Sequence, residues 1–204
     1  MSGGGDERAN DGEIFDVLDE MGNAVVGQAS RIDCHKKGFF LLLLSVSLSH
    51  SLSGLYHQSV HVLIRDCTTG RVLLQKRADS KRIAPGLWDI SCAEHLSVSE
   101  TFQQAAIRGM QEELGLEQRQ LFNVKQIRPK QLFRRQYSFT GESYIDNEFI
   151  ACFEAEIDEP KCKIRIDPDE VSDIKWVTTN WIKSDLENNP HIYTPWFHDE
   201  KHLL

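Results

Sequence analysis

Several charged side chains recur at short spacings within residues 94–116, and their types suit the binding of a metal ion. Glu112 and Glu113 are consecutive, and Arg108 precedes them by one helical turn. If this segment is helical, each residue turns by about 100°, so the two carboxylates lie on adjacent lines of the helix within reach of Arg108. Carboxylates gathered in this way can hold Mg²⁺, which neutralises negative charge and activates water. Acidic helix faces are common as solvated surface, so the residue types alone favour that plainer interpretation.

The complete spacing pattern favours the chemical interpretation. The segment reads EHLSVSETFQQAAIRGMQEELGL and resembles the Nudix box, G-x5-E-x7-R-E-U-x-E-E-x-G-U, in which U is a bulky apolar residue. Two positions depart from the motif, because Glu94 replaces its first glycine and Gly109 replaces a glutamate. The residues that fall at the required positions are Glu100, Arg108, Met110, Glu112, Glu113, Gly115 and Leu116.

The resemblance implies a metal-dependent hydrolase of a small diphosphate-containing substrate, with Mg²⁺ or Mn²⁺ as cofactor. It makes Glu112 and Glu113 catalytic metal ligands and gives Arg108 the task of orienting them. Position 109 projects between the two glutamates, so Gly109 is expected to leave a gap and to lower helix stability by about 1 kcal/mol relative to alanine. Glu94 is expected to weaken diphosphate binding through its charge; the less favoured alternative makes it a replacement metal ligand.

A longer stretch narrows the resemblance to isopentenyl-diphosphate isomerases and the hydrolases related to them. Residues 73–95, LLQKRADSKRIAPGLWDISCAEH, are similar to the segment before the box in that branch, and NEFIACFEAEI, DPDEVSDIKWV and TPWF continue the similarity. In the isomerases an arginine and a lysine grip the diphosphate, and Arg77 and Lys81 match them; ordinary surface charge is the alternative. The isomerases also hold a metal with histidines and carboxylates, and the matching residues are His57, His95, Asp146 and Glu148, with His35 if the intervening insertion loops out.

One position separates hydrolysis from isomerisation. The isomerase reaction needs a cysteine and a glutamate as an acid–base pair, and the resemblance places that cysteine at Ala93, which cannot transfer a proton. Cys92 is adjacent, but neighbouring side chains of an extended segment point to opposite faces. Glu148, at the position of the glutamate, is then expected to hold metal or to activate water. We therefore expect hydrolysis; isopentenyl-diphosphate isomerisation and a catalytically weakened diphosphate-binding protein are the alternatives.

The elements that must position these residues predict an α/β/α sandwich with a mixed β-sheet. Ser97 and Glu100 predict a capping box at the start of the box helix, and Gly115 predicts its end. Its buried face is expected at Ile107, Met110 and Leu114. Strands are predicted at 14–18, 24–26, 59–66, 71–74, 147–157 and 171–177, and a short helix capped by Thr179 or Asn180 is predicted to run through Leu186.

Length, charge and cysteine content bound the remaining possibilities. The 204 residues leave room for one domain, which we expect over residues 13–204 after a disordered Gly-rich and acidic tail at 1–12. The net charge of -8 argues against a basic nucleic-acid-binding surface and leaves a small molecule as the expected partner. The five cysteines are scattered and contain no C-x-x-C pair, which is typical of a reducing compartment and predicts the cytoplasm.

Residues 39–54 interrupt the family-like sequence with a Leu/Ser-rich run. No Asp, Glu, Lys or Arg occurs from 38 to 64, so a membrane span must be considered. The densely apolar part, 39–44, is far shorter than the ~20 residues that a spanning helix needs, so no membrane role is expected. Removing 39–54 leaves KKGLYHQSVHV, which resembles the entry to a Nudix sheet. The run is therefore interpreted as an atypical insertion, for which a gene-model artefact is one explanation; a membrane anchor or a hydrophobic interaction loop is the less favoured alternative.

Overall fold

The computed structural model describes residues 12–35, 54–139 and 141–204. The predicted tail at 1–12 and the predicted insertion at 39–54 lie outside the described residues, apart from Gly12 and Gly54. Within the described ranges, no helix combines the length and the hydrophobicity that crossing a membrane requires.

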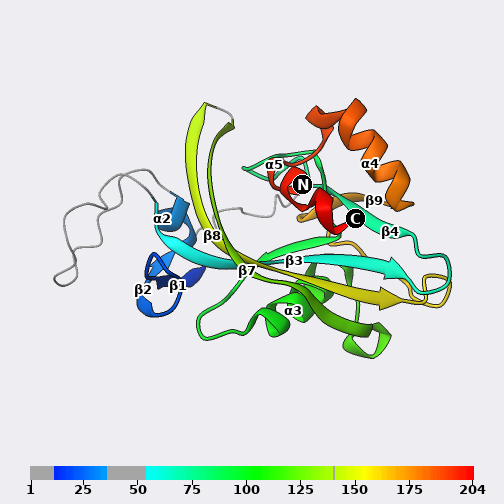
Figure 1. Cartoon of the computed structure of the whole chain (residues 1–204), viewed down its shortest axis with the longest axis horizontal. Helices are drawn as coiled ribbons and strands as arrows, with labels where there is room; N and C mark the ends of the chain where they lie inside the picture. The colour runs from blue at the N-terminus through cyan, green and yellow to red at the C-terminus, as the bar shows by residue number, and fades with distance from the viewer. Residues whose placement is uncertain (1–11, 36–53, 140) are drawn as a thin grey trace, which may run out of the picture.

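The described strands form one mixed sheet (Figure 1). The central strand β3 pairs in parallel with β8 and antiparallel with β1, β4 and β6. Further antiparallel pairs extend the sheet. Strand β2 pairs with β1, β5 and β9 each pair with β4, and β7 pairs with β8. The strands are β1 (Ile14–Leu18), β2 (Val25–Ser30), β3 (Tyr56–Asp66), β4 (Val72–Arg77), β5 (Trp88–Asp89), β6 (Cys92–His95), β7 (Phe122–Phe139), β8 (Glu142–Ile157) and β9 (Val171–Val177).

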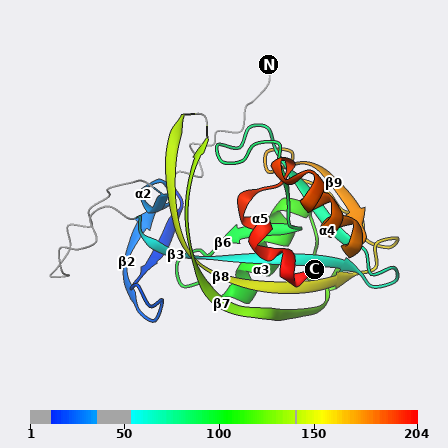
Figure 2. The ribbon, with the colours of Figure 1, turned by 45° about the horizontal axis from the view of Figure 1, so that its top comes forward.

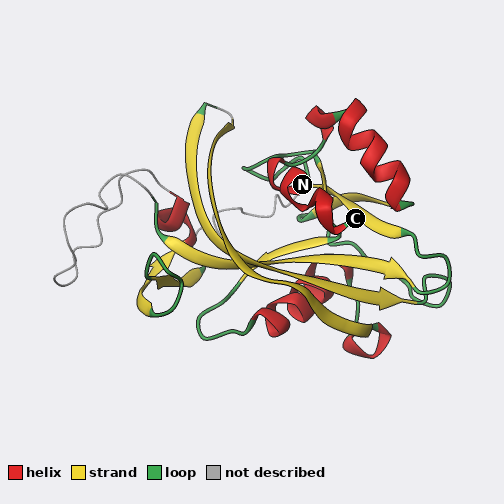
Figure 3. Cartoon of the chain, in the orientation of Figure 1, coloured by secondary structure: helices red, strands yellow, loops and turns green. Residues whose placement is uncertain are grey.

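Helices cover both faces of this sheet, which confirms the predicted α/β/α architecture (Figures 2 and 3). Helix α3 (Phe102–Leu114) lies on one face, and α4 (Thr179–Asn188) and α5 (Pro195–Glu200) lie on the other. The short α2 (Arg31–His35) packs against the first half of β8, where His35 approaches Asp146. Short 3₁₀ turns occupy Gln118–Gln120, Pro190–Ile192 and Lys201–Leu203.

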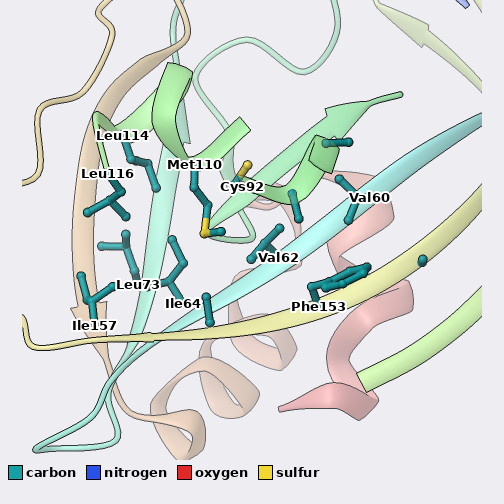
Figure 4. Packing of buried hydrophobic residues seen from close by; sticks show 14 of the residues in the cluster. Val60, Val62, Ile64, Leu73, Cys92, Met110, Leu114, Leu116, Phe153 and Ile157 are labelled. Atoms are coloured by element: carbon teal, nitrogen blue, oxygen red, sulfur yellow. The ribbon is translucent and has the colours of Figure 1, made fainter. Parts of the chain in front are cut away.

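Strand β3 is buried on both faces, and each face packs against a separate apolar core. Val60, Val62 and Ile64 pack with Met110 and Leu114 of α3 (Figure 4). Leu63 points the other way and packs with residues of α4 and α5. The same face as Leu63 also carries the buried polar residues His57, Ser59 and His61, so β3 keeps an alternation of apolar and polar side chains although both of its faces are buried.

The predicted start of the box helix is wrong by one turn. Ser97 and Glu100 form a turn before the helix, in which the Ser97 N–H donates to Glu100 Oε2 at 2.9 Å. The N-cap is Thr101, which forms a capping box with Gln104. Ser99 has a φ of 62°, a left-handed conformation that helical residues do not adopt, so the helix cannot begin earlier. The predicted end is confirmed, because Gly115 closes the helix with a φ of 64°.

Most other predicted elements are present with shifted bounds. The second strand begins at Val25 and runs to Ser30, well past the predicted end at 26, and the helix after β9 is capped by Thr178. The longest strand, β7, was not predicted. Its exposed positions are mostly charged or polar, so its sequence lacks the apolar run that indicates a strand.

Candidate active site

A cavity of about 490 Å³ opens between β4 and β6. It exists because β4 pairs with β3 near Arg65 and then departs to pair with β9, while β6 joins the same edge of β3 farther along, from Val62 to Ser59. Side chains from both strands and from α3 line the opening. Eight carboxylates outnumber four arginine and lysine side chains in its wall, so the cavity favours cations. The carboxylates are Glu13, Glu94, Glu112, Glu113, Asp146, Glu148, Asp167 and Glu170.

One group of predicted ligands meets on the face of β3 that carries His57. We call it the His57 cluster, and its members are His35, His57, His95, Asp146 and Glu148. His57 Nε2 lies 3.5 Å from Asp146 Oδ1 and 3.6 Å from Glu148 Oε1. His95 Nε2 lies 3.2 Å from the same Glu148 oxygen, and His35 Nε2 lies 3.7 Å from Asp146 Oδ1. The parallel register of β3 and β8 sets His57 opposite Glu148, and α2 supplies His35.

Main-chain carbonyls fix the proton on two of these rings. His35 Nδ1 lies 2.7 Å from the Arg31 carbonyl oxygen, and His57 Nδ1 lies 3.2 Å from that of Leu55. A carbonyl oxygen only accepts, so each Nδ1 carries hydrogen and each neutral ring presents the Nε2 lone pair to the carboxylates. Second hydrogen bonds of this kind orient histidine ligands in metal sites.

The cluster leaves its own polar atoms unsatisfied. Among the described residues, His57 Nε2, His95 Nε2 and Asp146 Oδ1 are buried and have no hydrogen-bond partner. Unpaired buried polar atoms are rare in folded proteins and require an explanation such as a bound ion. Groups of three from the cluster, including His35, His57 and His95, have ligand atoms within 4.8 Å of one another. The residues present therefore fit a divalent metal ion, for which imidazole and carboxylate are suitable ligands.

Burial and the charges of neighbouring residues raise some pKa values in this cluster and lower others. Burial raises the pKa of Asp146 to about 7, and the Glu148 carboxylate adds to the shift. Burial also opposes ionisation of Glu148, but His57 and His95 outweigh it and hold the Glu148 pKa well below its usual range. Burial lowers the pKa of His95 to about 3. It also lowers that of His57, yet Glu148 and Asp146 exceed this effect and raise the His57 pKa overall.

The second group of predicted ligands lies on α3, where Arg108 joins the carboxylates. Arg108 Nε donates to Glu100 Oε1 at 2.9 Å, and its NH1 donates to Glu112 Oε2 at 2.9 Å. Glu113 is buried; its Oε1 accepts the Cys92 thiol at 3.6 Å, and its Oε2 has no hydrogen-bond partner among the described residues. Burial and the charge of Glu94 raise the pKa of Glu113 well above its usual range. A cation beside Glu113 would favour its ionised form.

The predicted gap at Gly109 is absent. Gly109 is buried, and a Cβ added there would lie 2.8 Å from Cys92 Sγ and 3.0 Å from Glu94 Cβ. Side chains on β6 therefore fill the space that the prediction left open on α3. The helix period alone could not reveal this contact, since it joins a helix to a strand.

The two predicted phosphate-binding residues, Arg77 and Lys81, line the cavity but already have partners. Arg77 Nε donates to the Ile83 carbonyl oxygen at 3.1 Å. Its guanidinium also lies 5.4 Å from the ring centroid of Trp196. Lys81 is buried, and its Nζ lies 2.5 Å from Glu170 Oε2. Both cationic groups are therefore held by neighbouring residues of the cavity wall. A bound phosphate would have to share Lys81 with Glu170.

A comparison with known families decides the membership of the chain. The family model described as the NUDIX domain matches residues 55–197. The chain belongs to the Nudix family. The matched residues begin after the Leu/Ser-rich run and contain the whole box, and they include every ligand of the His57 cluster except His35.

Relatives of this Nudix chain carry two kinds of name. It is 32% identical to isopentenyl-diphosphate Delta-isomerase 2 of Photorhabdus laumondii, over 91% of this chain and 88% of that protein. It is 30% identical to Nudix hydrolase 3 of Arabidopsis thaliana, over 90% of this chain and 22% of that longer protein. Among solved structures, a Deinococcus radiodurans protein aligns with a TM-score of 0.63 at 19% identity, covering 94% of this chain and 96% of its own.

The structure around position 93 bears on the choice between isomerisation and hydrolysis. Ala93 lines the cavity, whereas Cys92 is fully buried in the core beneath α3. The two side chains therefore point to opposite faces, as predicted. Burial and the Glu113 carboxylate raise the pKa of Cys92 well above its usual range, so its thiol stays protonated and faces away from the opening.

Strand β7 contributes two residues that sequence patterns missed. The Tyr137 hydroxyl donates to Asp146 Oδ2, and Arg135 NH1 donates to Glu148 Oε2 at 3.3 Å. The antiparallel register sets Arg135 opposite Asp146. The alternation of Phe133, Arg135 and Tyr137 was the available signal, but it is weak without knowledge that β7 pairs with β8.

Proposed function

We propose that this Nudix protein hydrolyses a small diphosphate-containing molecule with the help of Mg²⁺ or Mn²⁺. The observation that carries the proposal is the set of unpaired buried atoms at His57, His95 and Asp146, beside a carboxylate-rich cavity that His95 and Asp146 line. Two buried histidines and a buried carboxylate with unpaired polar atoms are energetically unfavourable unless a cation binds between them. Bound divalent ions would offset the negative charge of the cavity and allow it to accept a nucleoside-diphosphate-linked or an isoprenoid diphosphate. A cytoplasmic location remains a prediction from the sequence.

Each predicted residue has a role that its position supports. The His57 cluster would hold one divalent ion, and Glu112 with Glu113 would hold metal at the box helix. When bound, such ions neutralise the diphosphate and lower the pKa of water. Arg108 keeps Glu112 in place through its NH1 contact. Arg77 and Lys81 would bind phosphate oxygens, and Glu148, with its depressed pKa, would stay ionised as a ligand or as the base for water.

Isopentenyl-diphosphate isomerisation is the second candidate, because relatives such as the Photorhabdus protein carry that name. Position 93 weighs against it, since alanine has no proton to give and Cys92 faces the core. Interconversion of the two five-carbon diphosphates by the purified protein, lost in Cys92→Ala, would establish isomerisation instead of hydrolysis. A catalytically weakened binding protein is the third candidate, and its support is the altered box at Glu94 and Gly109.

The proposal is tested by supplying nucleoside and isoprenoid diphosphates with Mg²⁺ or Mn²⁺ and measuring release of phosphate or of a monophosphate. We expect Glu113→Gln to lower the rate by about 10²-fold or more, since it removes a buried carboxylate from the site. Glu117→Gln is the matched control, because Glu117 is exposed and pairs only locally with Arg119 among the contacts described. An unchanged rate in Glu113→Gln would sink the assignment.

A further inference from the structure

Ser59 places an unpaired hydroxyl in the wall of the cavity. The residue lies on β3, two positions after His57, and it is 3% exposed. Its Oγ is buried and has no hydrogen-bond partner among the described residues. A serine hydroxyl can donate one hydrogen bond and accept others, and buried polar atoms without partners are rare in folded proteins. The Ser59 hydroxyl is therefore a candidate binding group for a ligand in the cavity.

The strand register sets Ser59 on the same face of the sheet as Ala93. In the antiparallel pair of β3 with β6, Ser59 is opposite His95 and His61 is opposite Ala93. Paired residues project from one face of a sheet, and so do residues two positions apart on a strand. Ser59 and Ala93 therefore both project from the face that carries the His57 cluster. The methyl group of Ala93 has no polar atom, so it cannot satisfy the Ser59 hydroxyl.

The cavity offers little apolar surface to a hydrocarbon chain. Its apolar lining residues are Ile83, Ala93 and Trp196, beside the phenol ring of Tyr137. Trp196 is 9% exposed, and the Arg77 guanidinium lies 5.4 Å from its ring centroid while Tyr137 meets it edge-on at 6.1 Å. Binding sites for apolar groups are lined mainly by apolar and aromatic side chains. This wall is instead dominated by charged and polar side chains.

A second unpaired acceptor lies in the same wall. Gln75 on β4 lines the cavity and is 3% exposed, and its Oε1 has no hydrogen-bond partner among the described residues. A hydrocarbon chain placed against Ser59 or Gln75 would keep these atoms from water without replacing the hydrogen bond, which is unfavourable. A ligand that carries hydroxyl groups would supply the missing partner.

We infer that Ser59 binds a hydroxyl group on the organic part of the substrate, so that the site selects hydroxylated diphosphates over diphosphates of plain hydrocarbons. A ribose and a sugar carry such hydroxyls, and an unmodified isoprenoid group has none. The inference rests on the proposed function and deepens it, because it chooses between the substrate classes that the function leaves open. A site that forms a hydrogen bond with a substrate hydroxyl discriminates against the analogue that lacks it.

The first test is equilibrium binding, which does not depend on turnover. Methylene-bridged analogues of three diphosphates are titrated by calorimetry with Mg²⁺ present: dimethylallyl diphosphate, its derivative with one terminal hydroxyl, and adenosine diphosphate. The first two share a carbon skeleton and differ only in the hydroxyl. We expect the wild type to bind both hydroxylated analogues about tenfold more tightly than the hydrocarbon analogue, as one added hydrogen bond allows. Equal or tighter binding of the hydrocarbon analogue overturns the inference.

The second test removes the hydroxyl with Ser59→Ala. The variant should bind the hydroxylated analogues about tenfold more weakly than the wild type does, and the hydrocarbon analogue equally well. Its Tm should stay the same or rise, because the lost hydroxyl has no partner among the described residues. Ser184→Ala is the matched control, since Ser184 is exposed on α4 and does not line the cavity. The inference is wrong if the preference survives in Ser59→Ala, or if all three affinities and the Tm fall together.

The proposed function and the inference fail in different ways. If the hydroxylated analogues bind selectively through Ser59 but no diphosphate is hydrolysed, the inference stands and the proposed function falls. If hydrolysis depends on Glu113 but proceeds equally well with dimethylallyl diphosphate and in Ser59→Ala, the function stands and the inference falls.

Discussion

Two buried polar clusters share strands β3 and β8, and they differ in whether the atoms that could bind a metal ion have hydrogen-bond partners. The His57 cluster uses His57 of β3 and Glu148 of β8. Four residues along each strand, His61 and Cys152 belong to a second group, which we call the Glu200 cluster and which also contains Arg128 and Glu200. Both clusters hold three potential metal ligands within 4.8 Å of one another.

The Glu200 carboxylate has a donor for every strong acceptor position it offers. Arg128 NH1 donates to Oε2 at 2.6 Å and Arg128 NH2 donates to Oε1 at 2.8 Å, a bidentate pair. His61 Nδ1 lies 2.9 Å from Oε1, and the Cys152 thiol donates to Oε2 at 3.4 Å. In the His57 cluster, by contrast, the facing atoms are left without partners. The comparison teaches that unsatisfied ligand atoms, rather than residue types, distinguish a candidate metal site from a structural ion pair. The unpaired atom of the Glu200 cluster, Arg128 Nε, is a donor and cannot bind a cation.

The strongest test of this contrast removes Arg128. Arg128→Ala leaves the Glu200 charge buried without its partner, so we expect a loss of about 3–5 kcal/mol in the free energy of unfolding, measured with urea. Arg128→Lys, which keeps the charge but not the bidentate contact, should lose less. A loss below about 1 kcal/mol in Arg128→Ala would mean that the pair does not anchor α5 to the sheet.

The carboxyl groups of Glu200 and Asp146, one from each cluster, should change the free energy of unfolding with pH in opposite directions. Burial opposes ionisation of Glu200, but His61 and Arg128 outweigh it and lower its pKa to about 2. Because the folded pKa lies below the unfolded value of about 4.5, this stabilisation is present above pH 4.5 and is lost as the pH falls towards 2. Its size is about 3 kcal/mol.

Asp146 should show the reverse behaviour in protein freed of metal by a chelator. Its pKa is raised to about 7 in the folded state, so folding becomes less favourable as the pH rises from about 4 to 7. Urea unfolding across pH should show the acid loss disappear in Glu200→Gln and the loss towards neutral pH disappear in Asp146→Asn. If both variants and the wild type show the same dependence of the unfolding free energy on pH, the predicted opposite effects of Glu200 and Asp146 are wrong.

Added metal sharpens the comparison further. Mn²⁺ at 100 times its Kd stabilises a folded protein by about 2.7 kcal/mol, so the Tm of the wild type should rise. In Glu148→Gln this rise should be much smaller, because a ligand of the His57 cluster loses its charge. Cys152→Ser is the matched control from the Glu200 cluster and should keep the full rise. If Cys152→Ser loses the Mn²⁺-dependent increase in Tm, the ion binds in the Glu200 cluster and not in the His57 cluster.

The sequence predicted the parts of the molecule that depend on local spacing. Strand β9 lies at the predicted residues, Gly115 ends α3, and Met110 and Leu114 face the core. Resemblance to the family also selected candidate ligands that the structure brings together from separate strands, as with His57 and Glu148.

Features that depend on contacts between distant segments were missed. The charged exterior of β7 hides a strand that becomes evident only beside β8. The supposed gap at Gly109 is filled from β6, and no helix periodicity contains that information. Ser99 shows a third cause: its left-handed backbone blocks an earlier helix start, although Ser97 and Glu100 have the spacing of a capping box.

The distribution of the His57 cluster along the chain also governs when it can form during folding. Its ligands come from α2, β3, β6 and β8, so His35 and Glu148 must be joined across most of the domain. Such long-range closure is slow, because its entropy cost precedes any contact. A nascent chain that has not yet paired β8 with β3 has no complete cluster. Metal capture should therefore be a late event that reports a finished sheet, and excess metal should slow unfolding without accelerating refolding.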